Sequence, residues 1–183
     1  FLSSPLRNAR WRRFCRANLP AGAADVPSLA FNRVFILLHC YRHFCGHGIG
    51  FKQLLDYYFV LTQGFTPEEK AESIRWIKRL GMLRFCRAIM WLMQNVFGMD
   101  ERYMLGDPDA DNGRFLLRCV LRSGNLGQGN KDNMISVNAL DRYWYNLRRD
   151  FRTIRICPFE SLWDPFFNVY QFVMSKTLWR RVK

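Results

Sequence analysis

The sequence predicts an all-α protein, folded as a single compact multi-helix domain of about seven or eight helices. Apolar residues recur at helical spacing along most of the 183 residues, and no convincing β-strand pattern is present. Glycine, proline and capping residues divide the chain into segments of helical length. With 49% hydrophobic and 16% aromatic residues, the chain can bury a sizeable core as one domain over residues 1–183.

The first predicted element is a short basic helix over residues 5–18. Ser3 or Ser4 precedes it as a cap, and Trp11 and Phe14 lie on its apolar side. Five arginines occupy the other faces: Arg7, Arg10, Arg12, Arg13 and Arg16. These arginines form either a solvated face or a seat for phosphate groups or for a partner domain.

After a proline-containing loop, the segment from about 29 to 45 is predicted to be a buried central helix. Only Asn32, Arg33 and Arg42 interrupt its apolar surface, which is the pattern of a helix surrounded by others. Aromatic and histidine side chains share one stripe at i, i+4 spacing: Phe31, Phe35, His39, His43 and His47. Three closely spaced glycines, at positions 46, 48 and 50, then end the helix.

A second helix follows, and its start carries three polar residues on one face, Lys52, Gln53 and Asp56. A sharp turn between the two helices could bring Asp56 opposite His43 or His47. Histidines on an apolar helix are more often satisfied core residues, whereas the functional interpretation has Asp56 orienting a histidine at the wall of a cleft. No metal site is predicted, because no third ligand stands at a recognised spacing beside the His-x3-His pair.

The next helix has the clearest start in the chain. Thr66 is its cap, and Glu69, three residues later, completes a capping box. This helix is predicted to run to about Leu80, where Gly81 breaks it, and a strongly apolar helix continues over 82–97. The methionine and aromatic side chains of the apolar helix indicate packing rather than a cofactor site.

The segment 98–113 is polar and rich in turn residues. Asp107, Asp109 and Asp111 imitate the start of a calcium-binding loop, but the sixth and twelfth positions lack the required glycine and glutamate. Asp111 is predicted instead to cap a helix over residues 114–122.

Residues 123–133, SGNLGQGNKDN, form either a flexible interhelical loop or a weak phosphate cradle. Two further helices are predicted over about 136–151 and 160–179. A second basic patch lies around the junction between them: Arg148, Arg149, Arg152 and Arg155.

The net charge of +13 is concentrated at both ends of the chain. Residues 1–56 hold eight basic and two acidic side chains, and residues 141–183 hold nine and four. A surplus of this size attracts anions, so nucleic acid, nucleotide phosphates or an acidic partner domain would account for it.

Other markers point to a cytoplasmic protein without a membrane segment. Six cysteines show no C-x-x-C pair and no regular framework, which predicts reduced and mostly buried thiols. No apolar run approaches the length of a membrane span. The chain begins with phenylalanine and has no secretory leader, so we expect it to be part of a longer protein.

Several stretches resemble one protein family. They are LHCYRHFCGHGIGFKQLLDYYFVL, the opening FLSSPLRNARWRRFCR, the later SGNLG and the late CPFESLWDPF. Together they resemble the C-terminal half of an uncharacterised bacterial nucleotidyltransferase family, whose members carry the core H-x3-H-F-x3-GIG-x-(R/K)-Q-x2-D. The resemblance covers most of the chain.

The resemblance implies a helical, substrate-side domain of an enzyme that transfers a nucleoside monophosphate from a nucleoside triphosphate (NTP) to an unknown acceptor. In that superfamily the metal-binding carboxylates lie on a small β-sheet domain, which would precede Phe1 here. Mg²⁺ and an NTP are therefore implied for the parent enzyme but not for this chain alone. The implied partner is the missing N-terminal catalytic domain, and this chain, with no catalytic residue of its own, is expected to be inactive alone.

The residues expected to face the nucleotide or another anionic substrate are His43, His47, Lys52, Gln53, Asp56 and Asn125. The alternative is a non-enzymatic basic helical module that binds nucleic acid or a protein partner. Interleaved arginine and aromatic residues allow nucleic-acid binding, but no helix-turn-helix or other recognised reader motif is present.

Overall fold

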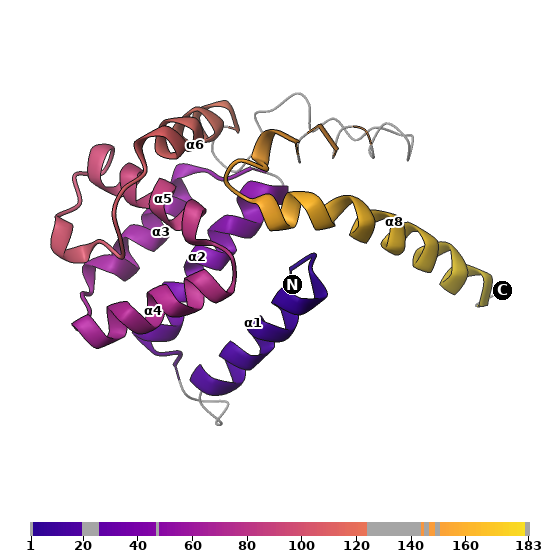
Figure 1. Cartoon of the computed structure of the whole chain (residues 1–183), viewed down its shortest axis with the longest axis horizontal. Helices are drawn as coiled ribbons and strands as arrows, with labels where there is room; N and C mark the ends of the chain where they lie inside the picture. The colour runs from indigo at the N-terminus through magenta and orange to yellow at the C-terminus, as the bar shows by residue number, and fades with distance from the viewer. Residues whose placement is uncertain are drawn as a thin grey trace.

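Helices are the only regular structure in the described part of the chain (Figure 1). The computed structural model describes residues 2–19, 26–46, 48–123, 144, 147–148 and 151–181, and beyond residue 170 the side chain of Met174 alone. These ranges contain seven α-helices with defined bounds and one short 3-10 helix, further helical residues at 144, 147–148 and 151–153, and no strand. The all-α prediction is confirmed.

The α-helices are α1 (Pro5–Asn18), α2 (Leu29–Gly46), α3 (Phe51–Thr62), α4 (Pro67–Arg79), α5 (Leu83–Asn95), α6 (Ala110–Ser123) and α8 (Pro158–Arg181), and the 3-10 helix is η1 (Glu101–Tyr103). The predicted glycine-rich loop and the predicted helix over 136–151 lie almost wholly outside the described residues.

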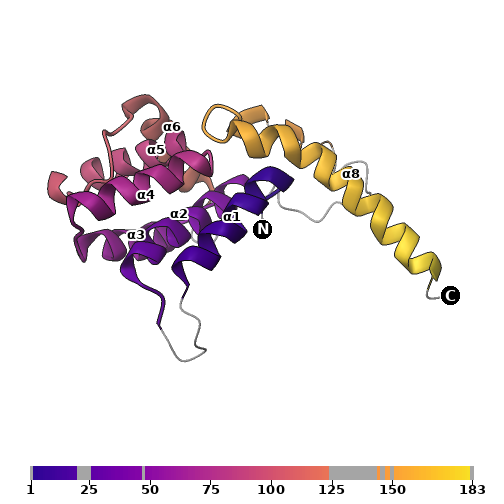
Figure 2. The same ribbon diagram turned by 60° about the horizontal axis from the view of Figure 1, so that its bottom comes forward.

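The predicted central helix is α2, which packs against α1, α3 and α4 (Figures 1 and 2). Val34, Leu37 and Tyr41 are among its fully buried side chains. One edge of α2 is open to solvent, because His39 and Arg42 are exposed. The helix is therefore central, but it is not covered on every side as its apolar sequence predicts.

Arg33 differs from the sequence expectation, since it is fully buried instead of standing as a polar interruption on α2. Its Nη1 donates to the Gly64 carbonyl at 3.0 Å, and its Nη2 lies 3.0 Å from a Glu69 carboxylate oxygen. Its guanidinium also lies 5.5 Å from the ring centre of Phe65. Arg33 thus fixes α2 to the turn between α3 and α4, where a buried arginine finds a carbonyl, a carboxylate and an aromatic face.

The start of α4 confirms the predicted capping box. The Glu69 amide donates to Thr66 Oγ1 at 3.2 Å, and the Thr66 amide donates to Glu69 Oε2 at 3.1 Å. The far end of α4 stops at Gly81, whose φ of 70° lies in the left-handed region that favours glycine.

The prediction that Asp111 caps the next helix is wrong. The helix α6 begins at Ala110, and Asp109 caps it, with Oδ1 accepting from the Asn112 amide at 3.0 Å. This backbone hydrogen bond is the main reason why the pKa of Asp109 is lowered. Asp111 lies in the first turn and pairs with Arg114 at 2.8 Å. Two aspartates two residues apart both satisfy the cap pattern, so the sequence pattern alone does not choose between them.

The last helix, α8, confirms the helix predicted from residue 160 and extends away from the other helices in both views (Figures 1 and 2). Among the described residues, the first turns of α8 are the part that the rest of the protein buries. There, Glu160 and Ser161 are buried, while most apolar side chains further along are exposed.

Candidate functional site

The candidate site is the corner where α2 ends and α3 begins. The glycine-containing turn folds α3 back along α2, and the Cys40 thiol donates to the Gln53 carbonyl at 3.3 Å. Lys52 and Asp56 are exposed on α3, and His43 is half-buried on α2. The start of α3 therefore presents a cation and a carboxylate to solvent. His47 and Asn125, also predicted for the site, lie outside the described residues.

Gln53 has a structural task at this corner. Its side-chain Oε1 accepts a hydrogen bond from the Gly50 amide at 3.1 Å and so caps the start of α3. An unpaired amide at a helix start is costly, which explains the glutamine at the third position of a helix whose cap residue is glycine. Gln53 orients the turn that carries the other candidates.

Asp56 makes no ion pair with His43 or Lys52 in the described structure, although the sequence allows both. The negative charge of Asp56 acts on Cys40 of α2. Burial is the main reason why the pKa of Cys40 is raised to about 12, and the charge of Asp56 is the second. Asp56 therefore lies within electrostatic range of the Cys40 thiol, although its own side chain is exposed. An exposed carboxylate in this position is available to a ligand.

His43 instead contacts His39, which the sequence does not single out as a site residue. Their Nε2 atoms lie 3.1 Å apart, and the two rings are nearly perpendicular, with an interplanar angle of 78°. His39 also stacks on Phe35, with ring centres 6.4 Å apart. The i, i+4 spacing carries this signal, since it places both imidazoles on one face of the helix.

A second polar cluster is buried and belongs to the core. Arg7, predicted among the arginines around α1, is buried and pairs with Glu160 at 2.7 Å. Its Nε donates to the Leu80 carbonyl at 2.6 Å, and its Nη1 lies 3.4 Å from the Tyr41 hydroxyl. Burial raises the pKa of Tyr41 well above its ordinary value. Because these groups are out of reach of solvent, they hold α1, α2, α4 and α8 together and offer nothing to a substrate.

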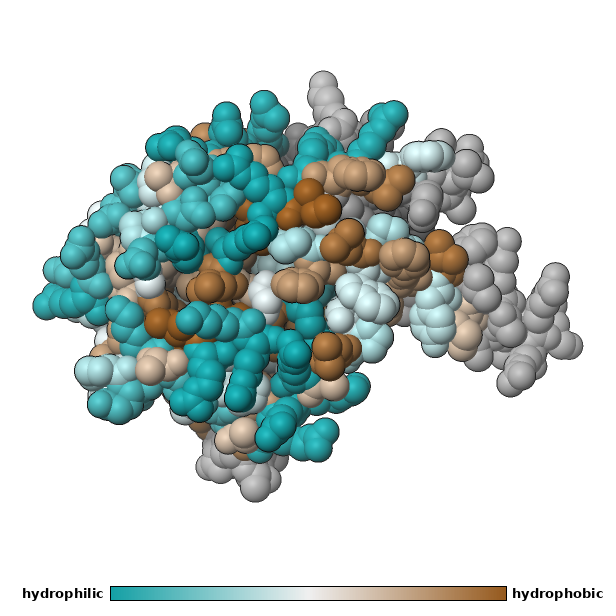
Figure 3. All heavy atoms as spheres, viewed as in Figure 1, coloured by the Kyte–Doolittle hydropathy of each residue, from teal (hydrophilic) through white to brown (hydrophobic). Residues whose placement is uncertain are grey.

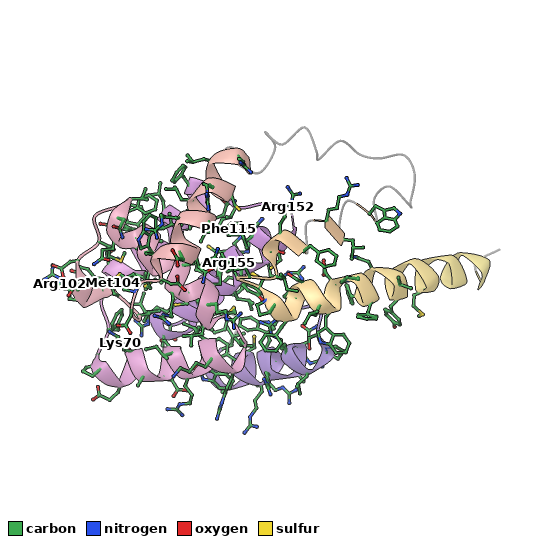
Figure 4. The ribbon with its side chains drawn as sticks, turned by 45° about the horizontal axis from the view of Figure 1, so that its top comes forward. Lys70, Arg102, Met104, Phe115, Arg152 and Arg155 are labelled. Carbon is green, nitrogen blue, oxygen red and sulfur yellow. The ribbon has the colours of Figure 1, made fainter. Side chains whose placement is uncertain are left out.

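The predicted basic patch extends onto α6. Arg148 and Arg152 are exposed, while Arg149 lies outside the described residues. Arg152 and Arg155 lie between α6 and the start of α8 (Figure 4). Burial raises the pKa of Cys119 on α6, and the charges of three arginines act against that rise: Arg122, Arg152 and Arg118. The sequence analysis missed the α6 arginines, because residues more than 25 apart carry no periodic signal linking them.

A cluster of metal-ligating side chains is absent from the described part of the chain. The described residues include no group of three or more His, Cys, Asp or Glu side chains placed to hold a metal ion. All six cysteines are free thiols, and Cys40, Cys86 and Cys157 are buried. No helix in the described ranges combines the length and apolar character needed to cross a membrane.

Comparison with protein-family models, with curated proteins and with solved structures finds no match. The resemblance to the nucleotidyltransferase family therefore rests on the sequence motifs alone.

Proposed function

We propose that this chain is the helical, substrate-side domain of a nucleotidyltransferase and that the corner between α2 and α3 faces the nucleotide. One observation carries the proposal: Lys52 and Asp56, both from the motif that resembles the family, are exposed one turn apart on α3, which packs against the helix that carries His43. Neither Lys52 nor Asp56 is buried in the core. Their placement fits contact with a ligand.

The chemistry of the corner suits a triphosphate and its sugar. The Lys52 ammonium would neutralise a phosphate oxygen as a point charge. The Asp56 carboxylate accepts hydrogen bonds, so it would bind a hydroxyl group of the ribose or of the acceptor. The net charge of +13 would draw the anionic nucleotide towards the surface.

Nucleotide binding tests the proposal. We expect the purified chain to bind a fluorescent NTP analogue weakly, and Lys52→Ala to weaken binding about tenfold, the value of one charge-assisted contact. Fluorescence anisotropy at fixed ionic strength measures the affinity. Lys78→Ala is the matched control, because Lys78 is also an exposed helical lysine but lies on α4.

Asp56→Asn should change the free energy of unfolding by less than about 0.5 kcal/mol, as an exposed substitution does. The same variant should impair nucleotide transfer by the full-length enzyme, whereas this chain alone should transfer none.

Equal nucleotide affinity of the wild type, Lys52→Ala and Lys78→Ala would show general charge attraction and would contradict a site at this corner.

The second candidate is a module that docks on a protein partner, and α8 is the feature that favours it. Among the side chains of this helix that the structure describes, seven large apolar ones are exposed: Phe159, Leu162, Trp163, Phe166, Val169, Tyr170 and Met174. At 3.6 residues per turn they fall within an arc of about 140° and form one stripe. Apolar side chains follow one another along α8 on the molecular surface (Figure 3).

An exposed apolar stripe of this size indicates that another molecule binds over it. Single exposed apolar residues are ordinary, but a continuous patch on a projecting helix is typical of an interaction surface. The net charge of +13 disfavours a second copy of this chain and favours an acidic protein surface. The acidic partner domain that would balance this charge is the occupant we infer.

Phe166→Ser tests the docking stripe, because Phe166 is 70% exposed and its loss should leave the fold intact. A cross-linker placed at position 166 captures the partner. The captured protein is then identified and purified for binding measurements. With both proteins pure, we expect Phe166→Ser to weaken binding at least about tenfold, as central aromatic residues of interfaces do, and added salt to weaken it further. Three outcomes would refute the acidic-partner proposal. The chain could bind to itself through α8, it could bind anionic vesicles through α8, or the captured partner could be basic.

A further inference from the structure

Two imidazoles converge on the exposed edge of α2. His39 is exposed, His43 is half-buried, and their Nε2 atoms lie 3.1 Å apart. We propose that His39 and His43 form a two-ligand site for a borderline divalent transition-metal ion, such as Ni²⁺, Cu²⁺ or Zn²⁺. The site is independent of the nucleotidyltransferase proposal and of its Mg²⁺.

The distance between the two nitrogens suits a shared ion. With metal–nitrogen bonds of about 2.0–2.1 Å, a separation of 3.1 Å gives a nitrogen–metal–nitrogen angle of about 100°. This angle lies between the right angle of a square-planar or octahedral site and the tetrahedral angle. The two nitrogens are therefore already at a separation that a shared ion requires.

The helix holds the pair ready for the ion. Both histidines project from the same face of α2, one turn apart, and the opposite face of that helix is locked in the core by residues such as Cys40, Tyr41 and Phe44. His39 is further oriented by its stacking on Phe35. Since the ligands are already in place, little conformational entropy is lost on binding.

Without metal, the two imidazoles are joined by a hydrogen bond, and metal binding replaces this hydrogen bond. In that bond one Nε2 carries the proton and the other accepts it. When both protons occupy Nδ1, each Nε2 presents a lone pair, and an ion takes the place of the bridging proton. The exchange moves one proton from Nε2 to Nδ1 of the donor ring through solvent, and the hydrated ion releases two of its bound water molecules as the two nitrogens take their places.

The donor set selects the ion. Neutral imidazole suits Zn²⁺, Cu²⁺ and Ni²⁺, whereas Mg²⁺ and Ca²⁺ prefer carboxylate, carbonyl and water oxygens. Among the divalent ions, Cu²⁺ should bind most tightly, as the general order of stability requires. Two protein ligands leave the remaining positions to water or to a donor atom from a bound ligand.

Calorimetric titration with Ni²⁺, and with Mg²⁺ as the hard-ion control, tests the site in the intact chain. Wild type should bind Ni²⁺ and not Mg²⁺ at this pair. His39→Ala should weaken Ni²⁺ binding at least about tenfold. Loss of a residue that only supports a metal ligand already lowers metal affinity by about 10- to 100-fold, and His39 is itself a ligand in this proposal. All variants keep the six cysteines, so thiol binding contributes equally to each titration.

His39→Gln separates the metal site from a purely structural hydrogen bond. Glutamine can still hydrogen-bond to His43, but its amide is a poor ligand for Ni²⁺. We expect His39→Gln to melt at the wild-type temperature without metal and to lose the rise in Tm that Ni²⁺ gives the wild type. Equal Ni²⁺ affinity in wild type and both His39 variants, or no Ni²⁺ binding by the wild type, would overturn the proposal.

Discussion

We expect Glu160→Ala to destabilise the fold by about 3 to 5 kcal/mol, because it leaves the buried Arg7 guanidinium without its carboxylate. The two side chains are only 4% and 3% exposed, and they meet at 2.7 Å. For a chain of this length the loss corresponds to a fall in Tm on the order of 10 °C. Urea unfolding followed by circular dichroism measures it.

The loss is large because Glu160 serves more than one donor. Its Oε2 also accepts from the Ser3 amide at 2.7 Å, so the substitution strands a backbone donor as well as a charge. Next to this contact, Ser3 Oγ lies 2.5 Å from Asp164 Oδ1. The start of α1 and the start of α8 are thus joined by a buried polar network, and removing its acceptor loosens both.

An exposed ion pair provides the matched control. Asp111→Ala breaks the surface pair with Arg114 on α6, and pairs of this kind contribute between 0 and about 1 kcal/mol. In addition, Arg7→Met combined with Glu160→Leu should be less destabilising than the sum of the single changes, since an apolar pair leaves no charge buried. If Glu160→Ala costs no more than Asp111→Ala, the network is not closed to water in solution.

The helix boundaries were the most predictable feature, because local chemistry sets them. The capping box of Thr66 and Glu69 and the helix break at Gly81 depend on a few neighbouring residues, and both stand as predicted. The start of α6 was not predictable, since Asp109 and Asp111 carry the same capping signal.

Burial of charged residues could not be predicted from the sequence. Arg7 and Arg33 are indistinguishable in the sequence from the exposed Arg10 and Arg42. What separates them is a partner far along the chain, such as Glu160, 153 residues from Arg7. A helical period shows which residues share a face, but it does not show what covers that face.

The candidate site was predictable in part for the same reason. The i, i+4 row contains both His39 and His43, and the same spacing places Lys52 and Asp56 one turn apart on α3, where both are exposed. The pairing of His43 with His39 rather than with Asp56 depends on side-chain directions, which sequence spacing does not fix. The exposed stripe of α8 was also missed, because the sequence does not reveal that this helix leaves the body of the protein.

Gly113→Val is the second change from which we expect a large effect, a loss of more than about 3 kcal/mol in the free energy of unfolding. Gly113 is buried where α6 crosses α5, and even a single added Cβ would lie 2.6 Å from Trp91 side-chain atoms. Valine adds three carbons where there is no room for one. Its better helix propensity, worth less than about 1 kcal/mol relative to glycine, offsets little of this strain. Thermal unfolding followed by tryptophan fluorescence measures the loss.

Gly106→Ala is the control, since an added Cβ at that position meets nothing within 4 Å and the backbone has no left-handed strain. Its free energy of unfolding should stay within about 0.5 kcal/mol of wild type. Trp91→Leu in the Gly113→Val background should recover part of the stability, because a smaller side chain makes room for the new methyl groups. If Gly113→Val unfolds like Gly106→Ala, α5 and α6 are free to move apart, and the close approach at Gly113 does not fix their packing.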